Sequence, residues 1–214
     1  MTEQIPLSLV PPIKFSKIEP TLFRGAYPRP INYRYLSTLK LRTMVALVPY
    51  AITNQTDPSL VSFCESNDIQ LIHIETDKDA KDKGKKRSIP IDHDQVLRVL
   101  ELILDKRNNP VFIFCSNGGQ ISSLVVACLR KLQFWSSVSI YNEFTNFSTT
   151  INHNDRTFIE NFRAKLKLPS ASRRVDWIWN GISANVIEKH PHLQFAYFSD
   201  DTTEDGAKNI PQKN

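Results

Sequence analysis

The residues of this chain that could do chemistry gather around one cysteine. Cys115 follows the apolar residues 111–114 and precedes a short loop with two adjacent glycines, Gly118 and Gly119. A glycine-bearing loop that opens a helix turns backbone N–H groups and the positive end of the helix dipole toward an anion. Such surroundings also lower the pKa of a cysteine thiol from its free value of about 8.5. The pattern predicts a thiolate above an anion-binding loop, formed by Ser116, Asn117, Gly118, Gly119, Gln120, Ile121 and Ser122.

One position in this loop does not fit the chemistry. Cysteine-dependent phosphate transfer places an arginine six positions after the cysteine, where its planar fork grips two phosphate oxygens. In this chain that position is Ile121, which has neither a charge nor a donor. Losing one donor to the developing charge typically costs on the order of 10²–10³ in rate. The chain thus has the scaffold of a phosphate-transfer site without its main phosphate-binding side chain.

Several segments around the loop carry a family resemblance through their order and spacing. These segments are residues 11–16, 22–29, 41–49, 128–136 and 140–144. With the loop, they make the chain resemble the plant-and-fungal atypical dual-specificity phosphatases, the group that contains the fungal oxidant-induced cell-cycle-arrest (Oca) proteins. The resemblance runs from about residue 11 to residue 162. It implies a three-layer α/β cysteine-phosphatase fold with a short, mostly parallel sheet, helices on both faces and a helical C-terminal half.

The resemblance also exposes how far the loop has changed. Active members read His-Cys-x-x-Gly-Lys-His-Arg-Thr-Gly, and they are associated with hydrolysis of phosphotyrosine and inositol pyrophosphates. This chain keeps Cys115 and Gly118 and has Ser122 in place of the threonine. It departs from the pattern at Phe114, Gly119, Gln120, Ile121 and Ser123. Four of these changes remove basic side chains, so we expect a pseudophosphatase in which Cys115 is a vestigial nucleophile.

A basic segment, residues 77–87, has two interpretations. It is either a solvated loop or an anion-facing flap, and the resemblance implies that this segment overhangs the loop and carries the general acid. Three aspartates remain open candidates for that acid: Asp77, Asp79 and Asp82. The residues predicted to attract an anion are Lys83, Lys85, Lys86, Arg87 and Arg130. Arg24, Arg29 and Lys131 either flank the same pocket or serve as surface charges and helix caps.

Strands and helices alternate on either side of the loop, which favours an α/β domain. Apolar and alternating runs predict strands at residues 43–48, 70–74 and 111–114, the last at the centre of a parallel sheet. Helical periodicity and start signals predict helices at residues 59–67, 92–105, 121–132, 137–147, 155–165 and 173–188, with a turn at 108–110.

Composition shifts divide the chain into four parts. We expect an extended arm at residues 1–12, the phosphatase-like domain at 13–168, a C-terminal helix and aromatic extension at 169–198, and a disordered tail at 199–214. The aromatic extension either closes the core or docks a partner. Trp177 and Trp179 are roughly 200° apart around a helix, so they would face different surfaces.

Bulk properties exclude several classes of protein. The chain has 214 residues, a net charge of +5 and three cysteines without a paired framework, which favours a reducing, cytoplasmic compartment. No apolar run approaches a membrane span, no secretory signal is visible at the N-terminus, and no nucleic-acid motif is present. His73 and His93 lack metal-ligand spacing with any cysteine, so we expect neither a metal site nor a cofactor.

Three functions remain open from the sequence. The first is a regulatory or scaffold subunit that forms a hetero-oligomer with related phosphatase-fold proteins. The second is a residual cysteine-dependent phosphatase acting on phosphotyrosine or inositol pyrophosphate, with another cation over Cys115. The third is a module that binds a phosphorylated small molecule on the loop amides without cleaving it. A redox role for Cys115 would need a lowered thiol pKa, which the missing arginine disfavours.

Overall fold

One five-stranded sheet organises the computed structural model, which describes residues 8–78, 87–191 and 193–197. The strands are β1 (Ser16–Glu19), β2 (Leu22–Ala26), β3 (Thr43–Val48), β4 (Gln70–Glu75) and β5 (Val111–Cys115). Their order across the sheet is β1-β2-β5-β3-β4, and only β1 runs antiparallel to its neighbour. The short, mostly parallel sheet expected from the resemblance is confirmed.

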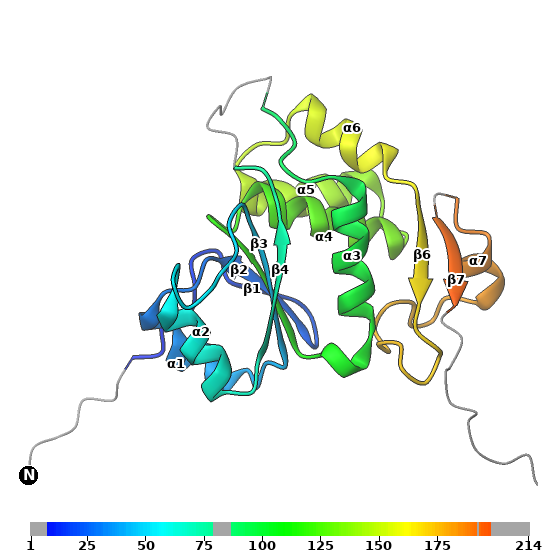
Figure 1. Cartoon of the computed structure of the whole chain (residues 1–214). Helices are drawn as coiled ribbons and strands as arrows, with labels where there is room; N and C mark the ends of the chain where they lie inside the picture. Colours follow the sequence, from blue (N-terminus) through cyan, green and yellow to red (C-terminus); the bar gives the residue numbers. More distant parts are fainter. Residues whose placement is uncertain (1–7, 79–86, 192, 198–214) are drawn as a thin grey trace, which may run out of the picture.

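Helices cover both faces of this sheet (Figure 1). One face packs against α1 (Pro30–Thr38) and α2 (Pro58–Ser66) through a buried apolar cluster. The other face packs against a larger cluster. The helices that supply it are α3 (His93–Leu104), α4 (Gln120–Leu132), α5 (Ser137–Ser148) and α6 (His153–Asn161). The molecule is therefore the three-layer α/β fold that the resemblance implies.

Strand β5 is central because every one of its residues is apolar and buried. Alternation along the strand sends Val111, Ile113 and Cys115 toward α3 and α4, and Phe112 and Phe114 toward α1 and α2. The predicted strand at residues 111–114 is confirmed, and it extends by one residue to Cys115 itself. The side chain of Cys115 is thus part of the apolar core between the sheet and α4.

Side-chain caps define the starts of the two predicted helices that flank β4. Asp57 accepts a hydrogen bond from Leu60 N at 3.0 Å, and Asp92 accepts one from Gln95 N at 2.7 Å. Each cap satisfies an otherwise unpaired amide and is worth about 1 kcal/mol. Both helices begin within one residue of their predicted starts.

The C-terminal part differs from the expectation. The predicted helix at residues 173–188 is wrong, since only α7 (Ala184–Glu188) is helical within it, and the predicted helix at 155–165 ends at Asn161. The chain continues as β6 (Ala164–Leu168), which pairs in parallel with β7 (Leu193–Tyr197). Leu166 and Leu168 are buried while Lys165 and Lys167 are exposed. Apolar and charged residues thus alternate along this segment, which is the pattern of a strand and not of a helix.

The two C-terminal tryptophans close the core from this irregular segment. Trp179 is buried and donates its indole N–H to Leu132 O at 2.9 Å. Trp177 is half-buried and donates to Thr21 Oγ1 at 3.2 Å. The core interpretation of these residues is confirmed, and the helical argument that placed them on opposite faces does not apply.

Two segments of the predicted organisation fall beyond what the structure describes. These are the first seven residues of the arm and the whole tail at 199–214. No helix in the described ranges combines the length and apolar character needed to cross a lipid bilayer.

Asp105 fastens the C-terminal segment to the end of α3. Its carboxylate accepts hydrogen bonds from Arg107 Nη2 at 2.8 Å and Arg173 Nη2 at 2.7 Å. Next to this ion pair, Val175 N donates to Leu104 O at 3.0 Å. Burial alone would raise the pKa of Asp105, but the hydrogen bonds from Arg107 and Arg173 outweigh it and lower the pKa to about 2.

Replacing Asp105 by asparagine should therefore lower the free energy of unfolding by about 2 kcal/mol at neutral pH. The ionised carboxylate supplies this stability, so it is fully present above an unfolded-state pKa of about 4 and is lost as pH falls toward 2. Urea unfolding of wild type and Asp105→Asn at pH 7 and pH 3 should show a smaller difference at pH 3.

Asp176→Asn is the matched control. Asp176 also pairs with a basic residue, Lys106, at 2.7 Å, but its side chain is 89% exposed. An exposed pair of this kind contributes at most about 1 kcal/mol. Equal losses for the two variants, or a loss at Asp105 that does not depend on pH, would contradict the assignment.

Candidate active site

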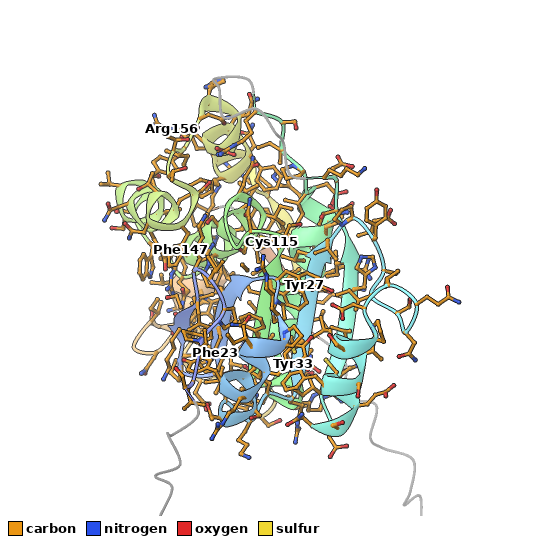
Figure 2. The ribbon with its side chains drawn as sticks, turned by 90° about the vertical axis from the view of Figure 1, so that its left-hand side faces the viewer. Phe23, Tyr27, Tyr33, Cys115, Phe147 and Arg156 are labelled. Atoms are coloured by element: carbon orange, nitrogen blue, oxygen red, sulfur yellow. The ribbon has the colours of Figure 1, made fainter. Side chains whose placement is uncertain are left out.

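Cys115 lies at the junction of β5 and the loop that leads into α4. Figure 2 shows it at the end of the sheet, near Tyr27 on one side and Phe147 on the other. The thiol is fully buried and donates to Ser122 Oγ at 3.6 Å. The predicted strand, loop and helix are therefore present in the predicted order, with Ser116 and Asn117 exposed at the mouth of the loop.

Gly118 sets the path of the loop. It has a φ of +65°, and a Cβ built there would lie 2.6 Å from Ala26 N and 2.8 Å from Gly25 C. The loop backbone thus packs directly on the end of β2, and no larger residue fits. Next to it, Gly119 N donates to Asn117 Oδ1 at 2.7 Å, so one loop amide already has an acceptor.

The positions where the resemblance expects basic side chains have other roles here. Ile121 is fully buried in the same apolar cluster as Cys115. Gln120 is buried and donates its side-chain amide to Asp155 Oδ1 at 2.9 Å and to Ser88 O at 3.0 Å. Neither residue offers a positive charge to a phosphoryl group.

Arg24, on β2, is the main site residue whose role sequence reasoning missed. Its guanidinium is 1% exposed, and Nη2 lies within hydrogen-bonding distance of four loop and helix acceptors. These are Gly118 O at 3.1 Å, Gly119 O at 3.4 Å, Ser122 Oγ at 2.9 Å and Ser123 Oγ at 2.8 Å. Burial lowers the pKa of Arg24 to about 10, which electrostatic attraction to Cys115 opposes.

The alternative that Arg24 is a surface charge or a helix cap is therefore wrong, whereas the alternative that it flanks the pocket stays a prediction. It holds the loop from inside the protein, and Phe147 covers one face of its guanidinium at 4.0 Å. A single arginine in the otherwise apolar, buried β2 was the available signal, because such a residue must find partners within the core.

Arg87, at one described end of the basic segment, does not have its predicted role. Arg87 is buried and forms an ion pair with the fully buried Asp155, which also binds Gln120. Its charge is thus neutralised, and the prediction that it attracts an anion is wrong. Asp77 is exposed, and its backbone N–H donates to Pro90 O at 2.9 Å. The remaining predicted residues, Asp79, Asp82, Lys83, Lys85 and Lys86, lie outside the described residues.

Arg130 and Lys131 lie near the opposite end of α4 from the loop. They are about 15 Å along the helix from its first residue, at a rise of about 1.5 Å per residue. Arg130 forms ion pairs with Glu19 and Glu143 and lies 4.2 Å from the centre of the Trp135 ring. The prediction that Arg130 attracts an anion at the loop is wrong, because its charge is neutralised by Glu19 and Glu143 far from the loop.

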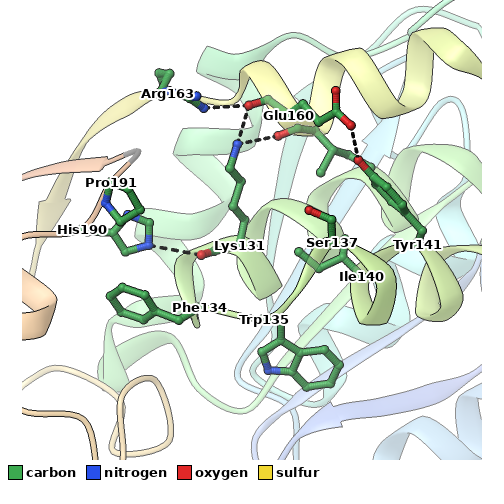
Figure 3. Close-up of a pocket in the computed structure, with 11 residues that line it drawn as sticks. Lys131, Phe134, Trp135, Ser137, Ile140, Tyr141, Glu160, Arg163, His190 and Pro191 are labelled. Carbon is green, nitrogen blue, oxygen red and sulfur yellow. Dashed lines mark hydrogen bonds between the residues drawn. The ribbon is translucent and has the colours of Figure 1, made fainter.

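Lys131 lines a cavity of about 400 Å³ away from the loop (Figure 3). Its ammonium donates to the carbonyls of Ile159, Glu160 and Phe162, at 2.9, 2.6 and 3.3 Å. Burial lowers its pKa to about 8. Lys131 thus caps the C-terminal end of α6, while Arg29 is an exposed residue at the start of α1.

A second cavity, of about 470 Å³, borders the loop at Ser116. Tyr27 and Tyr50 form aromatic walls, and Asp57 and Lys78 are its charged residues. Tyr27 donates to Asp57 Oδ2 at 2.8 Å, and burial together with this hydrogen bond raises the pKa of Tyr27. The tyrosine therefore stays protonated and fills one acceptor position of Asp57. No pattern in the sequence predicts that these tyrosines lie beside the loop.

The sequence and fold can be compared with known proteins on this basis. Residues 9–181 match the model of the tyrosine phosphatase family. "Putative tyrosine-protein phosphatase OCA6" of Saccharomyces cerevisiae is 41% identical over 181 residues, which cover 80% of each chain. "Inositol diphosphatase DSP2" of Oryza sativa subsp. japonica is 34% identical over 155 residues, which cover 72% of each chain.

Solved structures agree with these sequence matches. The core catalytic domain of the PP-IP phosphatase SIW14 from S. cerevisiae, in complex with citrate, gives a TM-score of 0.61 at 27% identity, covering 72% of this chain and 87% of that chain. P. aeruginosa TpbA shares the fold, with a TM-score of 0.51 at 17% identity, covering 69% of this chain and 84% of that chain. The chain belongs to the tyrosine phosphatase family, within its atypical dual-specificity branch of the fungal Oca type.

Proposed function

We propose that this protein is a catalytically impaired phosphatase, a pseudophosphatase, that acts as a regulatory or scaffold subunit with related phosphatase-fold proteins. The observation that carries the proposal is Ile121, fully buried beside Cys115 where the chemistry requires an arginine. Without that side chain, no guanidinium at position 121 stabilises the charge that develops on a phosphoryl group in the transition state.

Arg24 does not replace the missing arginine. Its Nη2 already meets the carbonyls of Gly118 and Gly119 and the hydroxyls of Ser122 and Ser123. Its side chain is buried under the loop and stacked on Phe147. A donor that must leave four acceptors to reach a substrate would leave buried carbonyls unpaired, which costs about 1–3 kcal/mol for each group.

The names of the relatives suggest what has been lost. Several plant relatives are named inositol diphosphatases, and their substrates are polyanions. In this chain the cavity that borders the loop has aromatic walls and one cation, Lys78, while Arg87 is neutralised by Asp155. Among the described residues, this cavity thus presents a single cation to a polyanion, which supports the loss of turnover on that class of substrate.

Purified wild-type protein should show no hydrolysis of para-nitrophenyl phosphate or of an inositol pyrophosphate above a Cys115→Ser control. The expectation follows from the missing arginine, whose absence removes transition-state stabilisation of at least 10²–10³ in rate. Released phosphate measures the reaction. Turnover that disappears in Cys115→Ser would overturn the impaired assignment and point to a residual cysteine-dependent phosphatase.

Ile121→Arg alone should keep phosphate release within about tenfold of the Cys115→Ser background, because Gly119 and Gln120 still lack basic side chains and Arg24 already places a charge under the loop. The triple variant Gly119→Lys, Gln120→His, Ile121→Arg should exceed the single variant in the same phosphate-release assay. Thermal unfolding of each variant separates lost folding from absent catalysis. Strong turnover by the single variant would show that the other two changes matter little.

An exposed apolar corner at the start of α5 supports the scaffold part of the proposal. Val138 is 79% exposed and Trp135 is 42% exposed, and they are close in sequence at the turn between α4 and α5. Neighbouring exposed apolar side chains of this kind favour a protein partner.

The scaffold proposal predicts a stable complex between this protein and a catalytically competent family member from the same organism. Sedimentation velocity of the purified mixture should show a heavier species that Val138→Asp weakens, because a charge would be buried at the contact. Val186→Asp on α7 is the matched control, since Val186 is 49% exposed but lies on a different element. Two independent sedimenting species for the wild-type mixture would contradict the proposed partner class.

A further inference from the structure

Lys14 lies beside the loop although it is about a hundred residues away in sequence. It has a φ of +54° in a turn that Phe15 N closes by donating to Pro12 O at 3.1 Å. The preceding residue, Ile13, accepts a hydrogen bond from Ala26 N at 2.8 Å. Because Ala26 also touches Gly118, this turn and the loop are fixed to the same end of β2.

Gly119 leaves the space that the Lys14 ammonium approaches. A Cβ built at Gly119 would lie 3.3 Å from Lys14 Nζ and 2.7 Å from Asn117 Oδ1. A side chain at position 119 would therefore compete with Lys14 for the same place. Lys14 forms no ion pair with any residue that the structure describes, so no carboxylate there neutralises its charge.

Arg24 adds a second cation on the buried side of the loop. Its Nε and Nη1 are buried and donate no hydrogen bond within the described part of the chain. Its charge also has no carboxylate within ion-pair distance among those residues. A buried cation without an ion-pair partner is costly, and an anion bound at the loop would offset part of that cost.

The loop also has backbone donors that no described residue uses. The amides of Asn117 and Gly118 form no hydrogen bond with any described residue, in contrast to the amide of Gly119, which donates to Asn117 Oδ1. Successive free amides in a glycine-bearing loop form a concave surface that suits a tetrahedral oxyanion.

We propose that Lys14 is the side chain that grips a phosphoryl group at this loop, in the place left by Gly119 and in the absence of an arginine at position 121. The ligand class is a phosphate ester, or inorganic phosphate, held by Lys14 and the loop amides with Arg24 beneath them. This inference goes beyond the proposed loss of turnover, because binding and hydrolysis are measured separately.

The test is isothermal titration calorimetry of the purified full chain with inorganic phosphate at low ionic strength. Lys14→Met should weaken binding by about tenfold or more, as expected for a charge-assisted hydrogen bond. Lys14→Arg keeps the charge and should stay within about threefold of wild type. Lys17→Met is the matched control, because Lys17 is an exposed lysine on the neighbouring strand β1.

Several results would overturn the inference. These are equal affinity for wild type and Lys14→Met, an equal loss in Lys17→Met, and no phosphate binding by wild type. Thermal unfolding of each variant confirms that it is folded; Lys14 is exposed, so its replacement should leave the unfolding temperature unchanged. Absent binding would leave the proposed loss of turnover intact, whereas hydrolysis by wild type would contradict that proposal and leave the role of Lys14 standing.

Discussion

The interaction on which the site depends is the buried guanidinium of Arg24. One nitrogen, Nη2, joins β2 to two loop carbonyls and to two hydroxyls in the first turn of α4. Carbonyls that point inward to a cation leave the N–H groups of the same peptides facing the other way. The buried charge therefore sets the orientation of the loop from below, independently of any ligand above it.

A second buried network gives position 120 a structural role. Gln120 donates to Asp155, and Asp155 also pairs with Arg87 and caps the first turn of α6. A fully buried carboxylate needs this set of donors, since an unpaired charge in the core would cost several kcal/mol. The side chain at position 120 thus serves the packing of α4 on α6, while Ile121 serves the apolar core.

Local patterns were enough to predict the centre of the fold. The apolar residues 111–114, the two glycines and the helix that follows them identify the loop, and Asp57 and Asp92 identify two helix starts. The burial of Arg24 had a signal in its apolar strand, but its partners could not be predicted, because only the parallel pairing of β2 and β5 brings Arg24 to the loop. The place of Lys14 had no signal, because its turn reaches the loop only through the hydrogen bond between Ala26 N and Ile13 O. The C-terminal helix failed for a related reason: contacts with Asp105 and Leu104 outweigh the helical period of residues 173–188.

Gly118 has a consequence for how such chains are recognised. Its place is required by contact with the backbone of Gly25 and Ala26, a matter of packing rather than phosphate chemistry. Folding alone is then a sufficient reason for a glycine and a curved loop here, whichever side chains stand at positions 119 to 121. A glycine at this position therefore reports the path of the backbone, and it carries no information about whether the loop binds or cleaves a phosphate ester.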